Sequence, residues 1–196
     1  MIKSKQRPDM LIAKSKRKSN IVEYLLYMYQ IEDIIRSFRL DINAINISII
    51  QKYDQGESIK KEIEDWYRTL IKEMKEEKIE VKGHLSQLTN IVEELVVLHN
   101  KLLTTIQDKK YMTLYEDAKP MLKQLLLKSE GEGLKNEIDV ALHGLYGLLL
   151  LRLKGEEITE LTEKGMQKIS SFLAHLAYWY HQLETDTIQI RAEQNN

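Results

Sequence analysis

The stretch SNIVEYLLYMYQIEDIIRSF, from Ser19 to Phe38, decides the fold class. Its apolar residues lie almost all the way round a helix, and it contains neither glycine nor proline. A helix with so little polar surface packs on more than one side, as helices inside a bundle do. The stretch therefore predicts a buried helix from about Asn20 to Phe38, with other helices around it.

The remainder of the chain contains few residues that end a helix. Its 196 residues include two prolines and eight glycines, and no alternating strand pattern is bounded by turn residues. Asp41 fits an N-cap and Gly155 a C-cap. We expect an all-α fold, a single-domain bundle of about seven helices. After the first helix, apolar spacing predicts helices at about 42–53, 58–77, from beyond Gly83 to 106, 111–128 with a kink or restart near Pro120, 136–154 and 160–182.

Composition excludes several classes of protein. The 29 Lys and Arg nearly balance the 30 Asp and Glu, so no strong single-sign field is expected. Cysteine is absent, which excludes disulfides, cysteine nucleophiles and thiolate metal ligands. No signal-peptide core follows the basic start, and the longest apolar run, LYGLLLLRL, is far shorter than the roughly 20 residues that cross a bilayer. We expect a cytoplasmic protein without membrane contact.

Several segments together resemble a known family. They are MLIAKSKRKSNIVEYLLYMYQIEDIIRSF, EIEDWYRTLIKEM, KGHLSQL, LYGLLLLRL and ISSFLAHLAYWYHQ. They are similar to a family of uncharacterised all-helical bacterial proteins, a domain of unknown function, over about residues 10–182. The resemblance implies an all-α single domain and no particular activity. It favours a flexible extension at residues 1–9, a helical domain at 10–185 and a tail at 186–196.

Two charged residues in the first helix are the leading candidates for chemistry. At about 100° per residue, Glu32 and Arg36 point into the apolar side of the helix, whereas Asp33 lies on the wet side with Glu23. Their four-residue spacing is that of an ion pair on one helix face. Such a pair is either a structural ion pair or a tuned functional group. We favour the structural interpretation, with a buried Glu32–Arg36 pair.

Histidine and tyrosine supply the remaining candidates. His99 lies on the apolar stripe of the helix that ends near 106, which favours a core histidine over a ligand. Tyr27 and Tyr178 belong to two aromatic clusters, in the first and last helices, and these favour a core or an oligomer interface over a ligand pocket. No Glu-x-x-His pair, His-Glu-x-x-His motif, phosphate loop or nucleophile motif occurs. We therefore expect no catalytic residue, metal or cofactor.

Three functions remain open. The favoured one is non-enzymatic protein–protein interaction, or a structural or regulatory role, with an unidentified protein or a second copy in a homodimer as partner. The first alternative is a ligand-binding module or metal-independent enzyme with a pocket near Glu32 and Arg36. The second is association with nucleic acid through the basic N-terminus, where seven of the first eighteen residues are Lys or Arg. No recognition helix accompanies that run, so a solvated tail is favoured.

Overall fold

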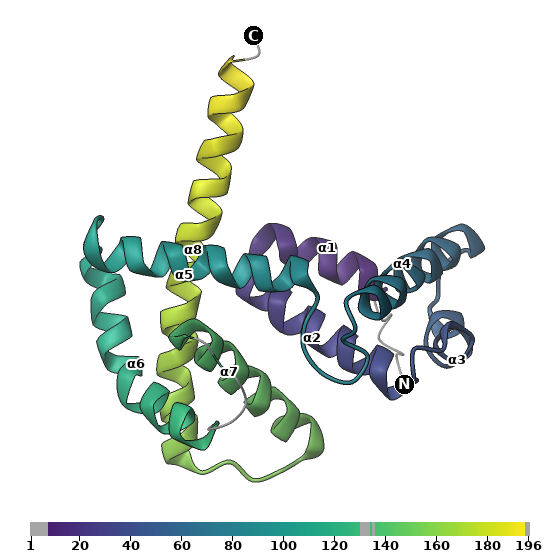
Figure 1. Cartoon of the computed structure of the whole chain (residues 1–196), viewed down its shortest axis with the longest axis horizontal. Helices are drawn as coiled ribbons and strands as arrows, with labels where there is room; N and C mark the ends of the chain where they lie inside the picture. The colour runs from purple at the N-terminus through teal and green to yellow at the C-terminus, as the bar shows by residue number, and fades with distance from the viewer. Residues whose placement is uncertain (1–7, 130–133, 135, 195–196) are drawn as a thin grey trace. The chain divides into compact units, whose positions relative to one another are not determined.

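The computed structural model describes residues 8–129, 134 and 136–194, with their side chains as far as Thr185. Within these residues the chain forms helices and no strand, so the predicted all-α fold is confirmed (Figure 1). In chain order the elements are α1 (Asp9–Ser19), α2 (Ile21–Ser37), α3 (Ile42–Ser48), the short 3-10 helix η1 (Ile50–Lys52), α4 (Glu57–Glu76), α5 (Ser86–Thr104), α6 (Lys109–Lys128), α7 (Glu137–Lys154) and α8 (Glu160–Gln194).

Four segments differ from the sequence prediction. The single helix predicted at about 42–53 is divided into α3 and η1. Helix α1 is an addition, because the sequence analysis treated its residues as a basic stretch and assigned no helix there. Helix α6 continues through Pro120, so a restart at that residue is wrong. The backbone of α8 continues to Gln194, past the predicted end near Gln182 and into the predicted tail. The side chains of residues 186–196 lie outside the described part of the chain.

Two predicted helix caps are found. The Asp41 carboxylate accepts hydrogen bonds from the backbone N–H groups of Asn43 at 2.8 Å and Ala44 at 3.4 Å, so it caps the start of α3. Gly155 ends α7 with a φ of +73°, a left-handed conformation that costs glycine little. Both ends can be read from sequence because a cap depends on residues that are neighbours along the chain.

The all-α domain divides into two compact units. Unit 1 contains α1, α2 from Glu23, α3, η1, α4 and the following chain as far as Thr89. Unit 2 contains the short piece Asn20–Val22 and the chain from Asn90 onward, which includes most of α5 and all of α6, α7 and α8. Each unit has its own set of buried apolar side chains.

Apolar residues at helical spacing form the core of unit 1. Burying a side chain of this size contributes about 1.5–3 kcal/mol, so each helix is held mainly by its apolar face. Helix α4 packs against α1, α3 and η1. The fully or almost fully buried side chains are Leu25, Met28, Tyr29, Ile31 and Ile35 of α2, Ile45 of α3, Ile50 of η1, and Ile63, Tyr67, Leu70, Ile71 and Met74 of α4.

A single carboxylate at the start of α1 joins three other parts of unit 1. Asp9 accepts hydrogen bonds from the hydroxyl groups of Tyr27 in α2, Tyr53 after η1 and Tyr67 in α4, each at 2.6 Å. Burial and the neighbouring carboxylate raise the pKa of all three tyrosines, so these hydroxyls remain donors. Asp9 therefore fixes the first turn of α1 against three segments that are distant in sequence.

This cluster changes the predicted boundary of the N-terminal extension. Residues 1–7 of the predicted extension lie outside the described residues. Asp9, which the sequence analysis placed in the extension, is the first residue of α1 and belongs to the packed unit. The carboxylate also lies at a helix N-terminus, where a negative charge is favourable. The packed domain thus begins before Met10.

Unit 2 is organised around α8, which packs mainly against α6 and also against α7. Gly165 permits the close approach of α6 and α8, because a Cβ at this position would lie 2.0 Å from Cε and 3.1 Å from Cγ of Met121. Among the described side chains of α8, buried residues recur every three or four positions as far as Tyr180. They are Met166, Ile169, Phe172, Leu173, Leu176, Ala177 and Tyr180.

Helix α8 is longer than the helices of unit 2 that cover it. Tyr180, the last buried residue among its described side chains, donates a hydrogen bond to Glu94 of α5 at 2.6 Å. Beyond this contact the yellow end of α8 projects past α5, α6 and α7 (Figure 1). None of the described helices, α8 included, combines the length and apolar character needed to span a membrane.

We expect Asp9→Ala to destabilise the protein by at least about 2 kcal/mol, because three partly buried hydroxyl groups lose their acceptor and an unsatisfied group costs about 1–3 kcal/mol. Urea unfolding measures the change. The matched control is Asp65→Ala, at an exposed position of α4 in the same unit. Equal stability of the two variants would show that the tyrosine cluster contributes nothing.

Candidate functional site

The inward face of α2 carries a carboxylate that has no contact with solvent. Glu32 is 0% exposed. Its Oε2 lies 2.6 Å from Nδ1 of His84, and its Oε1 accepts the backbone N–H of Leu85 at 2.8 Å. Because a carboxylate only accepts, Nδ1 of His84 carries the proton in this contact. Both oxygen atoms of the buried carboxylate are thus satisfied from one short segment.

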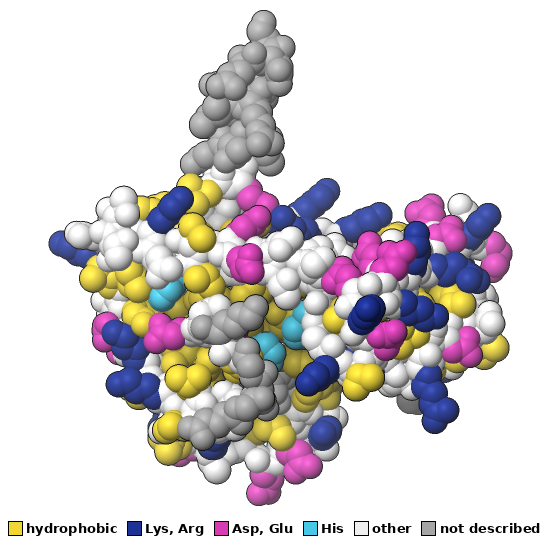
Figure 2. Space-filling model, viewed as in Figure 1, with side chains coloured by type: hydrophobic (Ala, Val, Ile, Leu, Met, Phe, Trp, Pro, Cys, Tyr) yellow, Lys and Arg dark blue, Asp and Glu magenta, His cyan; other side chains and the backbone are white. Residues whose placement is uncertain are grey.

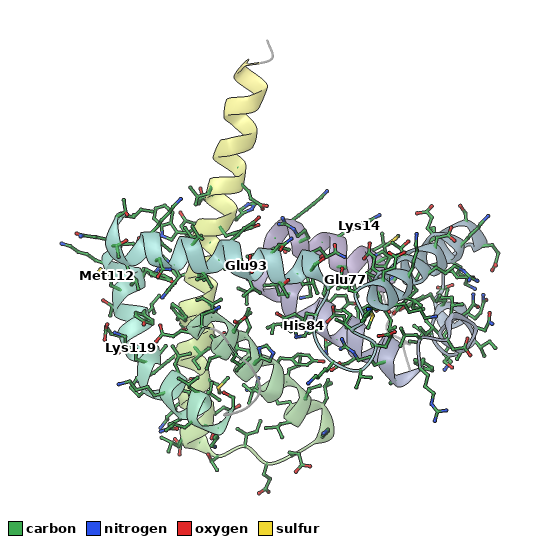
Figure 3. The ribbon with its side chains drawn as sticks, viewed as in Figure 1. Lys14, Glu77, His84, Glu93, Met112 and Lys119 are labelled. Atoms are coloured by element: carbon green, nitrogen blue, oxygen red, sulfur yellow. The ribbon has the colours of Figure 1, made fainter. Side chains whose placement is uncertain are left out.

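That segment is the connection between α4 and α5, and its backbone is shaped to reach α2. Lys78 and Gly83 have positive φ angles of 57° and 97°. The turn at Gly83 presents the imidazole of His84 and the N–H of Leu85 toward Glu32, and the side chain of Leu85 is fully buried beside them. Figure 3 labels His84 in this connection and Glu77 near its beginning.

Arg36 holds the same connection at a different point. Its guanidinium donates to the carbonyl of Ile79 from Nε at 3.3 Å and from Nη2 at 3.2 Å, and it also donates to the carbonyl of Gly83. Its ionic partner is Asp33, at 2.9 Å on the outer side of α2. The predicted ion pair between Glu32 and Arg36 is therefore wrong. The four-residue spacing places both on the side facing the connection, where each binds different backbone groups.

A further carboxylate closes the connection at the start of α5. Glu77 accepts the backbone N–H of Ser86 at 2.7 Å and the Ser86 hydroxyl at 2.8 Å. Together with Glu32 and Arg36, it ties the connection to its flanking helices. We call this set of contacts the connection clamp, defined by Glu32, Arg36, Glu77 and His84.

His84 is the functional candidate that the sequence analysis missed. Its ring stacks on Tyr29 with the ring centroids 3.7 Å apart, and its side chain is 20% exposed. A buried carboxylate that orients an imidazole is also found at catalytic sites. Here the carboxylate binds the neighbouring backbone as well, which is the pattern of a structural contact. The signal in the sequence was Gly83, whose backbone freedom allows His84 to turn toward α2.

Two further candidates, Tyr27 in unit 1 and His99 in unit 2, bind partners that give them a structural role. Tyr27 belongs to the Asp9 cluster. His99 is 6% exposed, with Nδ1 2.7 Å from the hydroxyl of Tyr111, so its predicted place in the core is confirmed. Burial lowers the pKa of His99, against an opposing effect of Glu137, whose carboxylate lies 3.8 Å from Nε2. The neutral ring is therefore the form that the core favours.

Tyr178 differs from the other candidates because it is exposed. Its side chain is 54% exposed and stacks on His175, with ring centroids 5.8 Å apart. His175 in turn lies 3.3 Å from the carboxylate of Asp108, which also accepts the indole N–H of Trp179 at 3.2 Å. The N–H of Tyr111 and these side chains lower the pKa of Asp108. The aromatic group on α8 is thus held in a defined arrangement.

The stretch of α8 around Tyr178 contains no charged side chain of its own, and the Asp108 carboxylate reaches it from the start of α6. From Ile169 to Leu183 the chain contains no Asp, Glu, Lys or Arg, although 30% of the whole sequence is charged. Part of this stretch is exposed, so the absence of charge is not explained by burial. We call the exposed residues the uncharged face of α8, defined by Ser170, Ser171, Ala174, Tyr178 and His181.

Unit 2 also contains an apolar pocket of about 280 Å³ between α6, α7 and α8. Leu125, Gly147, Leu151 and Met166 lie in its wall. Its lining is mostly apolar, and Lys128, Ser129, His143 and Thr162 are the polar side chains in it. Among the described residues, no group of three or more His, Asp or Glu side chains is arranged to hold a metal ion.

We expect His84→Ala to lower the free energy of unfolding by about 3 kcal/mol, because the fully buried Glu32 loses one of its two donors. His84→Asn should restore part of this loss, since its amide can donate in place of Nδ1. When Glu32→Leu is combined with His84→Ala, the change in unfolding free energy should differ from the sum of the two single changes by about 1–3 kcal/mol. Lys61→Ala, at an exposed position of α4 in the same unit, is the control. Additive effects at Glu32 and His84 would contradict the clamp.

The core position of His99 predicts a pH effect. Its pKa is lowered in the folded state, so the unfolded chain binds a proton first as the pH falls. The stabilisation is complete above about pH 6.5 and is lost as the pH drops through the lowered folded-state pKa. In His99→Gln, unfolding free energy should therefore fall less between pH 7 and pH 5 than in the wild type. An unchanged pH dependence would refute this role.

The comparisons with known proteins agree with the fold and add no activity. A family model described as "Domain of unknown function (DUF4924)" matches residues 10–187. No curated protein and no solved structure matches the chain. The matched residues include α2, the connection clamp and the uncharged face of α8, and they confirm the resemblance seen over about residues 10–182. The chain therefore belongs to the family of the domain of unknown function DUF4924.

Proposed function

We propose that this protein acts by binding another protein and not as an enzyme, and that the uncharged face of α8 is its binding surface. The observation that carries the proposal is the run from Ile169 to Leu183, which lacks Asp, Glu, Lys and Arg while including exposed positions. Surface helices normally carry charged residues on the side that faces water. Protein interfaces differ from other surfaces by depletion of charge and enrichment in tyrosine and tryptophan.

Helical geometry places the residues of this face together. At about 100° per residue, Ser171 lies about 20° from Tyr178, and Ala174 lies about 40° away on the other side. His181 lies about 60° from Tyr178 on the same side as Ala174. Small side chains beside one large aromatic ring allow another helix to approach closely while the ring supplies most of the contact area.

The arrangement of Tyr178 supports a role in binding. A tyrosine has few rotatable bonds, and contact with the His175 ring restricts it further. His175 and Trp179 are themselves held by Asp108. A side chain that is ordered before binding loses less conformational entropy when a partner arrives.

The alternative functions have less support from the described residues. The hydrogen bonds of Glu32 and Arg36 are directed at the α4–α5 connection, which favours the structural role over a ligand site. In the basic segment, Lys16 pairs with Glu23 at 2.6 Å, and Arg17 lies over the ring of Tyr24. Positive and negative side chains are interspersed on the face shown in Figure 2, without one continuous basic groove.

Tyr178→Lys tests the proposal by placing a charge at the centre of the face. We expect at least a tenfold loss in the recovery of proteins that co-purify with the tagged chain from its host, a second untagged copy included, because a central tyrosine often contributes more than about 1.4 kcal/mol to binding. Leu161→Lys is the matched control, since Leu161 is 73% exposed on the same helix but outside the face. Circular dichroism checks that both variants are folded.

An equal loss in both variants, or no loss in either, would contradict a binding role for this face. If Tyr178→Lys retains every co-purifying protein, the binding surface does not include Tyr178 and lies elsewhere on the protein.

A further inference from the structure

We infer that the apolar pocket of unit 2 binds a small amphiphilic molecule, a carboxylic acid with an apolar body and about twelve non-hydrogen atoms in all. The apolar body lies against α7, and the carboxylate pairs with Lys128. This inference goes beyond the proposed function, because the pocket shares no residue with the uncharged face of α8.

The volume of the pocket sets the size of the ligand. Protein interiors are close-packed, and few of their voids are larger than a water molecule. The pocket between α6, α7 and α8 has a volume of about 280 Å³. An engineered cavity of about 150 Å³ in another protein holds benzene, so a pocket of nearly twice that volume accommodates about twelve non-hydrogen atoms.

One face of α7 forms the longest wall of the pocket. Val140, Gly144, Gly147 and Leu151 follow one another at steps of four, three and four residues, which places them on one face of the helix. From Val140 to Leu151 the helix rises about 16 Å. Val140 is 3% exposed whereas Leu151 is 43% exposed, so the pocket has a buried part and also reaches the surface. It therefore suits an elongated molecule that enters from solvent.

Gly147 is a separate observation in favour of a ligand, because close packing does not explain a glycine there. It lies inside α7, where glycine is less favourable than alanine, and a Cβ at this position would meet no atom within 4 Å. Gly144 on the same wall shows the contrast, since its Cβ would lie 2.5 Å from Cδ1 of Leu125. Packing explains Gly144, whereas Gly147 leaves space in the wall of the pocket.

The charge of the lining indicates an acidic ligand. Lys128 at the end of α6 is exposed, and it is the one Lys, Arg, Asp or Glu among the described residues that line the pocket. His143 adds a ring that becomes positive when it is protonated, and its Nδ1 donates to the carbonyl of Asp139 at 2.9 Å. A carboxylate beside Lys128 accepts a charge-assisted hydrogen bond, whereas an amine there is repelled.

Decanoate is the probe for the first experiment, and the methyl group of Met166 reports on its binding to the full chain. Met166 lines the pocket and is 2% exposed. We expect decanoate to shift the Met166 signal in methionine-methyl NMR spectra, with a dissociation constant of about 0.1–1 mM for a ligand of this size. The signal of Met112, which is 39% exposed on α6 and outside the lining, is the internal control.

Substitutions at Gly147 test whether decanoate occupies this pocket. Gly147→Leu fills the space and should weaken binding roughly tenfold or more. Thr113→Leu, at an exposed position of α6 outside the lining, is the matched control and should leave binding unchanged. Gly147→Ala provides a second test in case the leucine variant does not fold. It should raise the melting temperature, because alanine favours the helix, and should still weaken binding.

Three probes of equal chain length test the charge of the ligand. We expect decanoate to bind more tightly than decanol, and decanol more tightly than decylamine. Lys128→Met should weaken decanoate about two- to fivefold, the range for an exposed ion pair, and should leave decanol unchanged. Lys123→Met, at an exposed lysine of α6 outside the lining, is the control.

Several results would overturn the inference. If no probe shifts the Met166 signal, or if decanoate binds Gly147→Leu as tightly as the wild type, the pocket is not the ligand site. A lower melting temperature for Gly147→Ala would show that the fold itself requires the glycine. Equal binding of decanoate and decylamine, or an unchanged affinity in Lys128→Met, would exclude an acidic ligand. None of these results depends on Tyr178, so the proposed function is tested separately.

Discussion

A carboxylate with no access to water sets the strongest constraint on unit 1. Burying an ionised carboxylate is unfavourable unless donors replace its water. Glu32 obtains these donors from His84 and Leu85, both in the connection between α4 and α5. The connection must therefore adopt the backbone conformation that presents them, including the positive φ of Gly83. Arg36 binds the carbonyl groups left on the same segment, so the buried charge indirectly fixes where α5 begins.

The same solution recurs for other carboxylates of the protein. Asp9 accepts three tyrosine hydroxyls, and Asp108 accepts a backbone N–H, an indole N–H and a histidine contact. Glu94 accepts the hydroxyl of Tyr180. Tyrosine hydroxyls, the indole N–H and backbone N–H groups satisfy a carboxylate without removing a second charge from water, and the desolvation of two ions is what makes buried ion pairs weak stabilisers. Tyrosine adds apolar area with the same side chain, so these contacts and the packing of the core reinforce each other.

Because these donors come from distant parts of the chain, the sequence could predict some features and not others. Most of the helices, the caps at Asp41 and Gly155, and the buried positions of Glu32 and His99 depend on neighbours within one helix, and the sequence predicted them. The partner of Glu32 was not. Spacing along a helix suggested Arg36, whereas the actual contact is with His84, far along the chain. No local pattern identifies such a partner, because tertiary packing brings the two segments together. Helix α1 was missed for a related reason, since Asp9 has its binding partners in α2, α4 and the chain after η1.

The distribution of charge also links the fold to the proposed function. Inside the units, carboxylates are retained and are bound by aromatic and backbone donors, whereas an exposed part of α8 has no Asp, Glu, Lys or Arg. Water alone does not favour such a surface, because charged side chains there would be well solvated. One helix face supplies less than the roughly 800 Å² that each partner buries in a standard interface. Binding through this face is therefore expected to be reversible and to depend strongly on its single large residue, Tyr178. Reversible association responds to changes in protein concentration, which suits a regulatory role better than a permanent structural one.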